Sequence, residues 1–114
     1  MNMDHSTLAV ISEINRFNIV EYLLGGPKPV GEISQKLHMT QPKTSKHLRV
    51  LADAGVVDVQ IKAQQRIYSL SPQKFEEIDE WISQFKKLWE QRLDRLDKMF
   101  KKAPGPKGTN ENKF

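Results

Sequence analysis

The last third of the sequence is the feature that most restricts the possible folds. Between Gln73 and Lys102 no glycine or proline interrupts the chain, and apolar residues recur in steps of three and four. This spacing predicts one long amphipathic helix that begins at Ser71 or Pro72 and ends near Lys102. Its apolar stripe consists of Ile78, Ile82, Phe85, Trp89, Leu93, Leu96 and Phe100, and is widened by Trp81, Leu88 and Met99.

One small domain cannot cover the whole apolar side of such a helix. About thirty residues at about 1.5 Å per residue span roughly 45 Å, whereas a small domain is about 30 Å across. The alternatives are that the stripe packs entirely on its own domain, or that the helix bends back on itself. A bend would need a cause such as glycine or proline, and this segment has neither. We therefore expect part of the stripe to meet a second copy of the chain.

The length and composition fit one small globular domain. The chain has 114 residues, of which 38% are hydrophobic and 28% charged. We expect a folded domain over residues 1–102 and a disordered tail over residues 103–114, where the sequence is polar and contains proline and glycine. The sequence shows neither a signal peptide nor a long apolar run, so a cytoplasmic location is expected. Because it has no cysteine, disulfides, thiolate metal sites and cysteine nucleophiles are excluded.

Shorter helices are predicted before the long one. The stretch STLAVISEINRFNIVEYLL has a helical rhythm of apolar residues and forms two short helices or one bent helix, with Ser6 as a possible N-cap and Gly25 as the stop. The next segment, GGPKPV, is predicted to be a turn. The segment VGEISQKL then forms a helix of about two turns, which points Val30, Ile33 and Leu37 inward and is broken by HMT.

A further helix is predicted to begin after Thr40, a suitable N-cap, with Pro42 in its first turn. At 100° per residue, one side of this helix collects the residues expected to pack inward, which are Thr44, Leu48 and Leu51. The opposite side is polar and cationic. Gly55 is suited to end the helix in a left-handed conformation.

The cationic side of this helix has no balancing carboxylate before Asp53. It carries Lys43, Lys46 and Arg49, and the segment from Lys28 to Arg66 has seven basic residues against three acidic ones. Like charges on one helix face repel each other, so such a face is either simply solvated or meets a partner of negative charge.

Two short segments after the helix, VVDVQIK and RIYSL, alternate in polarity and are rich in β-branched and aromatic residues, and AQQ between them suits a hairpin tip. The predicted fold class is therefore mainly α with a small β-hairpin, a helix-turn-helix followed by a wing. A helix of this kind fits the major groove of DNA, where its first turn faces base edges and its cations neutralise phosphates.

From about Leu8 to Phe100 the chain resembles the ArsR family of bacterial winged-helix transcriptional repressors. The most specific parts are VGEISQKLHMTQPKTSKHLRVLADAGVV and RIYSLSPQKFEEIDEWI, which include the Ser45-Lys46-His47-Leu48 core of the second helix and the Ala-Gly turn that leads to the wing. The resemblance implies a sequence-specific DNA-binding repressor without metal sensing. This chain departs from the family at the wing tip, KAQQR, which lacks a glycine and a dense run of arginines.

The resemblance also implies a set of residues that contact double-stranded DNA: Gln41, Lys43, Thr44, Ser45, Lys46, His47 and Arg49 from the helix, with Lys62 and Arg66 from the wing. Lysines and the wing arginine are expected to bind phosphates, whereas Gln41, Ser45 and Arg49 are expected to discriminate bases. The helical projection places His47 at the edge of the packed face, so it could bond to a neighbouring side chain, contact a phosphate, or do both.

Members of this family dimerise through their first and last helices. For this chain the resemblance implies a homodimer interface formed by Leu8, Ile11, Phe85, Leu88, Trp89, Leu93, Leu96 and Phe100. Two-fold symmetry would place two recognition helices about one DNA turn apart, so the operator is expected to be an inverted repeat.

Three other function classes compete with a DNA-binding repressor. A metal-responsive repressor would need ligands that are absent, since there is no cysteine and no histidine lies between Pro72 and Lys102, while His5, His38 and His47 are scattered. An enzyme is not expected, because no phosphate-binding glycine loop or nucleophile with a base is present. A winged-helix module that binds another protein is the remaining alternative. No cofactor is predicted.

Overall fold

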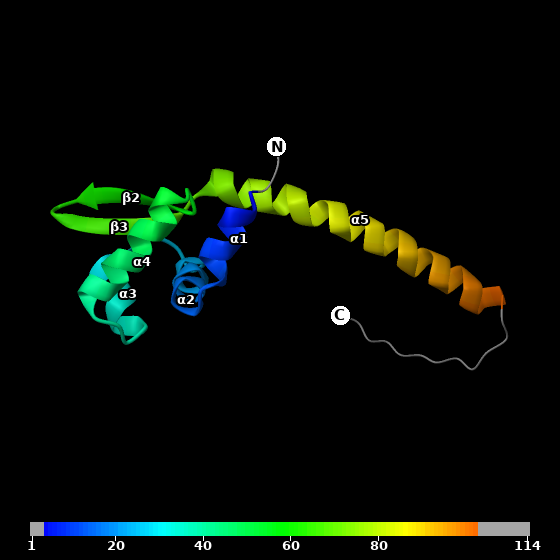
Figure 1. The fold of residues 1–114 in the computed structure, drawn as a ribbon, viewed down its shortest axis with the longest axis horizontal. Coiled ribbons are helices and arrows are strands. Elements are labelled where there is room, and N and C mark those ends of the chain that lie inside the picture. Colours follow the sequence, from blue (N-terminus) through cyan, green and yellow to red (C-terminus); the bar gives the residue numbers. More distant parts are fainter. Residues whose placement is uncertain (1–3, 103–114) are drawn as a thin grey trace. The chain divides into compact units, whose positions relative to one another are not determined.

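The structure, a computed structural model, describes residues 4–102. The chain divides into two compact units, one ending at Asp79 and the other starting at Glu80. The described elements are α1 (His5–Ser12), α2 (Ile14–Leu23), β1 (Lys28–Pro29), α3 (Val30–Lys36), α4 (Gln41–Asp53), β2 (Val57–Lys62), β3 (Gln65–Leu70) and α5 (Pro72–Lys102) (Figure 1). The mainly helical winged helix-turn-helix class predicted from the sequence is confirmed.

The ends of α4 follow the local sequence signals. Thr40 is the N-cap, and its Oγ1 accepts a hydrogen bond from the Lys43 backbone N–H at 3.2 Å. Pro42 lies in the first turn, where the missing N–H leaves no intrahelical bond unmade. After the helix, Gly55 has a φ of +77°, a conformation that residues with a Cβ rarely adopt. The predicted position of this helix is confirmed.

The start of the first helix was predicted wrongly. Asp4, not Ser6, is the N-cap of α1, and its carboxylate accepts hydrogen bonds from the Ser6 backbone N–H at 3.3 Å and from Ser6 Oγ at 2.9 Å. Both residue types cap helices well, so composition could not choose between them. The chain then breaks at Glu13, which has extended dihedral angles, and this break separates α1 from α2.

The three strands form one antiparallel sheet in the order β1-β3-β2. The predicted hairpin is confirmed, with Lys62 paired to Gln65, so that Ala63 and Gln64 alone form the turn. Both have positive φ, as a tight type I′ hairpin turn requires.

The prediction that GGPKPV is only a turn was incomplete. Its residues Lys28 and Pro29 form β1 and pair with Tyr68 and Ile67 of β3. Proline is tolerated there because β1 is an edge strand, where one side of the backbone needs no partner.

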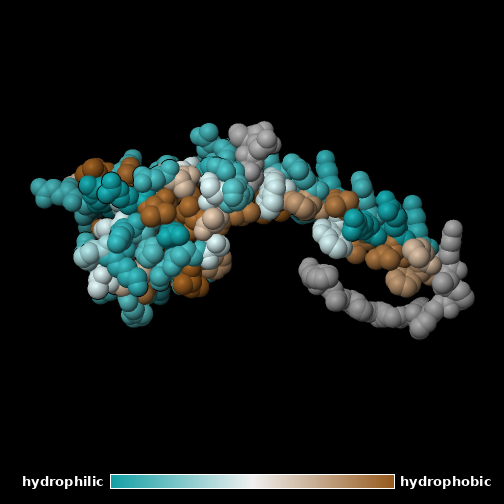
Figure 2. Space-filling model, viewed as in Figure 1, coloured by the Kyte–Doolittle hydropathy of each residue, from teal (hydrophilic) through white to brown (hydrophobic). Residues whose placement is uncertain are grey.

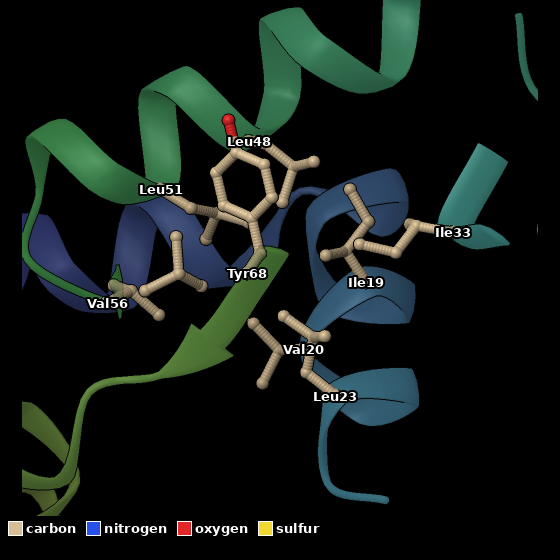
Figure 3. Close-up of a cluster of buried hydrophobic side chains, with 9 residues drawn as sticks. Ile19, Val20, Leu23, Ile33, Leu48, Leu51, Val56 and Tyr68 are labelled. Atoms are coloured by element: carbon tan, nitrogen blue, oxygen red, sulfur yellow. The ribbon is translucent and has the colours of Figure 1, made fainter. Parts of the chain in front are cut away.

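The core of the first unit holds α4 against the rest of the fold. Its buried apolar residues are Ile19, Val20, Leu23, Ile33, Leu48, Leu51, Val56, Val57 and Tyr68. Figure 3 shows Leu48 and Leu51 reaching from α4 toward Tyr68 of β3. The predicted inward positions of Ile33, Leu48 and Leu51 are confirmed, since all three are fully buried. Because this face of α4 is buried, its opposite face is directed to solvent.

The helix α5 has the bounds predicted from the sequence. Its residues from Ile82 to Phe100 leave large apolar side chains exposed within the protomer, with exposed fractions between 43% and 72%. Figure 2 shows these apolar side chains gathered along one side of α5. On the same helix, the rings of Trp81 and Phe85 pack edge to face with their centres 5.0 Å apart, and the Arg92 guanidinium lies 5.8 Å from the centre of the Trp89 ring.

The predicted tail over residues 103–114 lies outside the described residues. Among the helices within residues 4–102, none has the length and apolar character needed to span a membrane.

Candidate nucleic-acid interface

The solvent side of α4 gathers most of the side chains predicted to contact DNA. Exposed residues on it, which we call the α4 outer face, are Gln41, Lys43, Ser45, Lys46 and Arg49. In the described part of the chain, none of the three cations on this face makes a salt bridge. The α4 outer face is therefore a polar surface with uncompensated positive charge, held in place by the buried side of the same helix.

Thr44 does not belong to this surface, and the prediction that it contacts DNA was wrong. Its side chain is fully buried, and its hydroxyl donates a hydrogen bond to the Thr40 carbonyl oxygen at 2.9 Å. A buried hydroxyl that already has a partner inside the protein cannot reach a base or a phosphate. Thr44 instead helps to fix the first turn of α4.

His47 lies at the edge of the α4 outer face and is bonded to a neighbouring side chain. Only 16% of the side chain is exposed. Its Nδ1 atom lies 3.3 Å from Nη1 of Arg16 and 3.8 Å from Oε1 of Glu13, both in or next to α2. The neighbour predicted for His47 therefore exists, and a phosphate contact stays a prediction.

Sequence reasoning gave no functional role to Glu13 and Arg16. Arg16 also donates from Nε to the Val10 carbonyl oxygen at 2.7 Å. The only available signal was that His47 lies at the edge of a packed face, which indicates a partner but does not identify one 31 positions away in the sequence.

Glu13 also caps α2. Its Oε1 accepts a hydrogen bond from the Arg16 backbone N–H at 2.9 Å, and its Oε2 accepts one from Asn15 Nδ2 at 3.1 Å. The bond from the Arg16 backbone is the main cause that lowers the pKa of Glu13 below its ordinary value of 4.5. The ionised carboxylate is thus the form that stabilises this corner of the fold.

We expect Glu13→Gln to lower stability at neutral pH and to flatten its decline in acid. A carboxyl whose pKa is lower in the folded chain than in the unfolded chain contributes stability above the unfolded value, and this contribution is lost as the pH falls through the folded value. The stabilities of wild type and variant should therefore converge below about pH 4.5. Urea unfolding at several pH values measures this, and a difference that stays constant with pH would contradict it.

The wing presents the two predicted cations on either side of its tip. Lys62 and Arg66 are both exposed, and Arg66 pairs across the hairpin with Ile61. The turn between the strands contains no charge, so the charged contacts of the wing with phosphates would come from these two side chains.

The residues predicted to form the dimer interface differ in exposure. Leu8 is 40% exposed, and the members on α5 are all exposed. Ile11 is half-buried and packs against the core of its own unit. It therefore has a structural role within the protomer, whether or not a partner also touches it.

Within residues 4–102, no three histidine, aspartate or glutamate side chains lie where they could share a metal ion.

Comparison with known proteins points to one class. A family model described as "Bacterial regulatory protein, arsR family" matches residues 15–59, which cover α2 to the start of β2. The transcriptional repressor SdpR of Bacillus subtilis is 28% identical over 81 residues, which are 71% of this chain and 90% of that protein.

Solved structures show the same fold. The crystal structure of the transcriptional repressor BigR from Xylella fastidiosa has a TM-score of 0.56 and 32% identity, and covers 60% of this chain and 69% of its own. An ArsR-family transcriptional regulator has a TM-score of 0.63 at 22% identity, and covers 79% of this chain and 97% of its own. The latter likeness is evidence for the fold alone.

Proposed function

Since the chain belongs to the arsR family of bacterial regulatory proteins and is a DNA-binding transcription regulator, we propose that it is a homodimeric repressor that binds an inverted-repeat operator. The α4 outer face carries this proposal. It presents Lys43, Lys46 and Arg49 to solvent with no carboxylate partner in the described part of the chain, and DNA phosphates supply the missing counter-charges.

The residues of the α4 outer face have different tasks in this proposal. Lys43 and Lys46 bind phosphates, together with the wing cations, and supply an attraction that does not depend on sequence. Gln41 lies in the first turn of α4, the part of a recognition helix that reaches base edges. Ser45 and Arg49 add further base discrimination from the same side of the helix.

The exposed apolar stripe of α5 supports the homodimer. Eight large apolar side chains are exposed between Ile82 and Phe100, and a surface of this kind marks an interaction site in a water-soluble protein. In a two-fold dimer, two copies of α4 about 34 Å apart match successive turns of the major groove. The names of SdpR and BigR support repression, which would act in the cytoplasm by blocking access of polymerase to the promoter.

Selection of genomic DNA fragments by the purified protein tests the proposal. We expect the retained fragments to share an inverted repeat whose half-sites lie about ten base pairs apart, centre to centre. Fragments that share no motif, or one half-site without symmetry, would refute the operator proposed here.

We expect Lys46→Ala to weaken binding to all DNA sequences by a similar factor. It removes one phosphate contact, so the slope of log affinity against log salt should flatten by about one unit. Filter binding or fluorescence anisotropy at several salt concentrations measures both effects. The control is Lys87→Ala, which removes the same charge from α5 and should leave the slope unchanged; an unchanged slope for Lys46→Ala as well would exclude Lys46 from the interface.

We expect Gln41→Ala to relax specificity at one base pair of each half-site by about 1 to 3 kcal/mol. A glutamine amide can bond to two atoms of adenine at once, and alanine offers no such pairing. Affinities for an operator and for its single-base variants measure the change. Equal weakening on the operator and on random DNA would show that Gln41 does not read a base.

The exposed stripe of α5 also favours a second candidate, a winged-helix module that binds another protein and has no specific operator. This candidate predicts no steep dependence of DNA affinity on salt, and makes Trp81 or Trp89, not Lys46, the sensitive residue. Addition of zinc or nickel to the DNA complex distinguishes a metal-responsive repressor from both candidates. The DNA affinity of such a repressor would fall or rise when the metal is added.

A further inference from the structure

Arg16 joins three helices through one side chain. From α2, its Nε donates to the Val10 carbonyl oxygen of α1 at 2.7 Å, and its Nη1 lies 3.3 Å from Nδ1 of His47 on α4. The side chain is half-buried. Arg16 therefore fixes the edge of the α4 outer face to the corner between α1 and α2.

The contact with Arg16 decides which nitrogen of neutral His47 carries the proton. A guanidinium group has only donors, so Nδ1 of His47 must accept, and the proton of the neutral ring is then on Nε2. Oε1 of Glu13 lies 3.8 Å from the same Nδ1 atom, beyond hydrogen-bond length, and already accepts from the Arg16 backbone N–H. The Nε2–H tautomer is thus the one that fits this site.

The Nε2 atom of His47 is not fully buried. Within residues 4–102, each fully buried side-chain nitrogen or oxygen of a buried or half-buried residue has a hydrogen-bond partner. His47 is half-buried, and within residues 4–102 its Nε2 atom has no hydrogen-bond partner, so this atom keeps some exposure. The ring therefore accepts through Nδ1, and the N–H on Nε2 has no acceptor within residues 4–102.

We propose that Arg16 is a positioning residue that makes neutral His47 a directional hydrogen-bond donor to a DNA phosphate. This inference rests on the proposed DNA-binding function. On α4, His47 is about 40° from Lys43 and about 100° from Lys46, so it lies toward the border between the outer and packed faces. A side chain at that border meets the sugar-phosphate backbone beside the groove, and a phosphate oxygen is the acceptor that a lone N–H finds there.

Two amide substitutions at His47 separate this role from a structural one. Glutamine places an amide near the position of Nε2, whereas asparagine places one near Nδ1. We expect His47→Gln to keep operator affinity within about threefold and His47→Asn to lose about tenfold, the range for a hydrogen bond to a charged group. The reverse order, or equal affinities for the two variants, would overturn the proposal.

A substitution of Arg16 tests the positioning itself. We expect Arg16→Gln to lower operator affinity by about tenfold and to leave the salt slope unchanged, because Arg16 would touch no phosphate. A slope that falls by about one unit would make Arg16 a direct phosphate contact and overturn the assigned role. In the double variant with His47→Asn, the loss should not exceed that of either single variant, since both remove the same contact.

Nitrogen NMR of the His47 ring supplies a readout that needs no DNA. We expect the Nε2–H tautomer in the wild type, a mixture of tautomers in Arg16→Gln, and the wild-type pattern in the control Arg49→Ala, which removes an exposed cation from α4. A tautomer that does not change in Arg16→Gln overturns the inference. A wild-type protein that binds no DNA would instead refute the proposed function, so the two failures are distinguishable.

Discussion

Replacement of Leu93 and Leu96 by aspartate is expected to make the protein monomeric and to weaken operator binding by at least about a hundredfold. Both side chains are half exposed in the protomer, at 53% and 47%, so the substitutions leave the fold of each chain intact. In a dimer they would bury carboxylates without partners, which costs several kcal/mol. A monomer then binds a single half-site. It loses the affinity that a dimer gains because its two recognition helices are linked and the second binds at a high effective concentration.

Sedimentation velocity measures the first effect, and titration with operator DNA measures the second. The matched control is Lys87→Gln with Gln91→Asp, which makes the same change in charge on the opposite side of α5, since both positions are about 160° from Trp89 on a helical projection. We expect the control to remain dimeric. If the leucine variant also sediments as a dimer, the stripe of α5 is not the interface.

Truncation of Leu48 to alanine is expected to cost about 2 to 5 kcal/mol of unfolding free energy. Leu48 is fully buried and reaches from α4 into the cluster that contains Ile19, Leu51 and Tyr68, so alanine leaves a cavity there. Because domains of this size are stable by only about 5 to 15 kcal/mol, the variant should be partly unfolded near physiological temperature. Loss of DNA binding would follow from the loss of the fold.

Urea unfolding monitored by the fluorescence of the tryptophans or by circular dichroism measures this cost. The control is Val50→Ala on the same helix. Val50 is 37% exposed, so this substitution should change the unfolding free energy by well under about 1 kcal/mol, because the small loss of buried area is offset by the better helix propensity of alanine. A cost below about 1 kcal/mol for Leu48→Ala would mean that α4 is not held by this core.

Local signals determined the positions of α4, the hairpin and α5. Thr40 and Gly55 bound α4 through a cap and a left-handed residue, and both effects act within a few residues of the chain. The stripe of α5 follows from a period that any helix imposes. For the same reason the α4 outer face could be listed from the sequence, because a helix that buries Leu48 and Leu51 must turn the intervening residues outward.

Tertiary structure decided the details that depend on distant partners. Lys28 and Pro29 become a strand only because the edge of β3 is available to pair with them. The buried position of Thr44 depends on what packs against α4, and the cap at Asp4 on where α1 begins. Helical angles placed His47 at an edge, but only the fold brings Arg16 to its Nδ1 atom. Periodicity and capping are properties of short segments, whereas the identity of a partner across the molecule is fixed by how the segments pack.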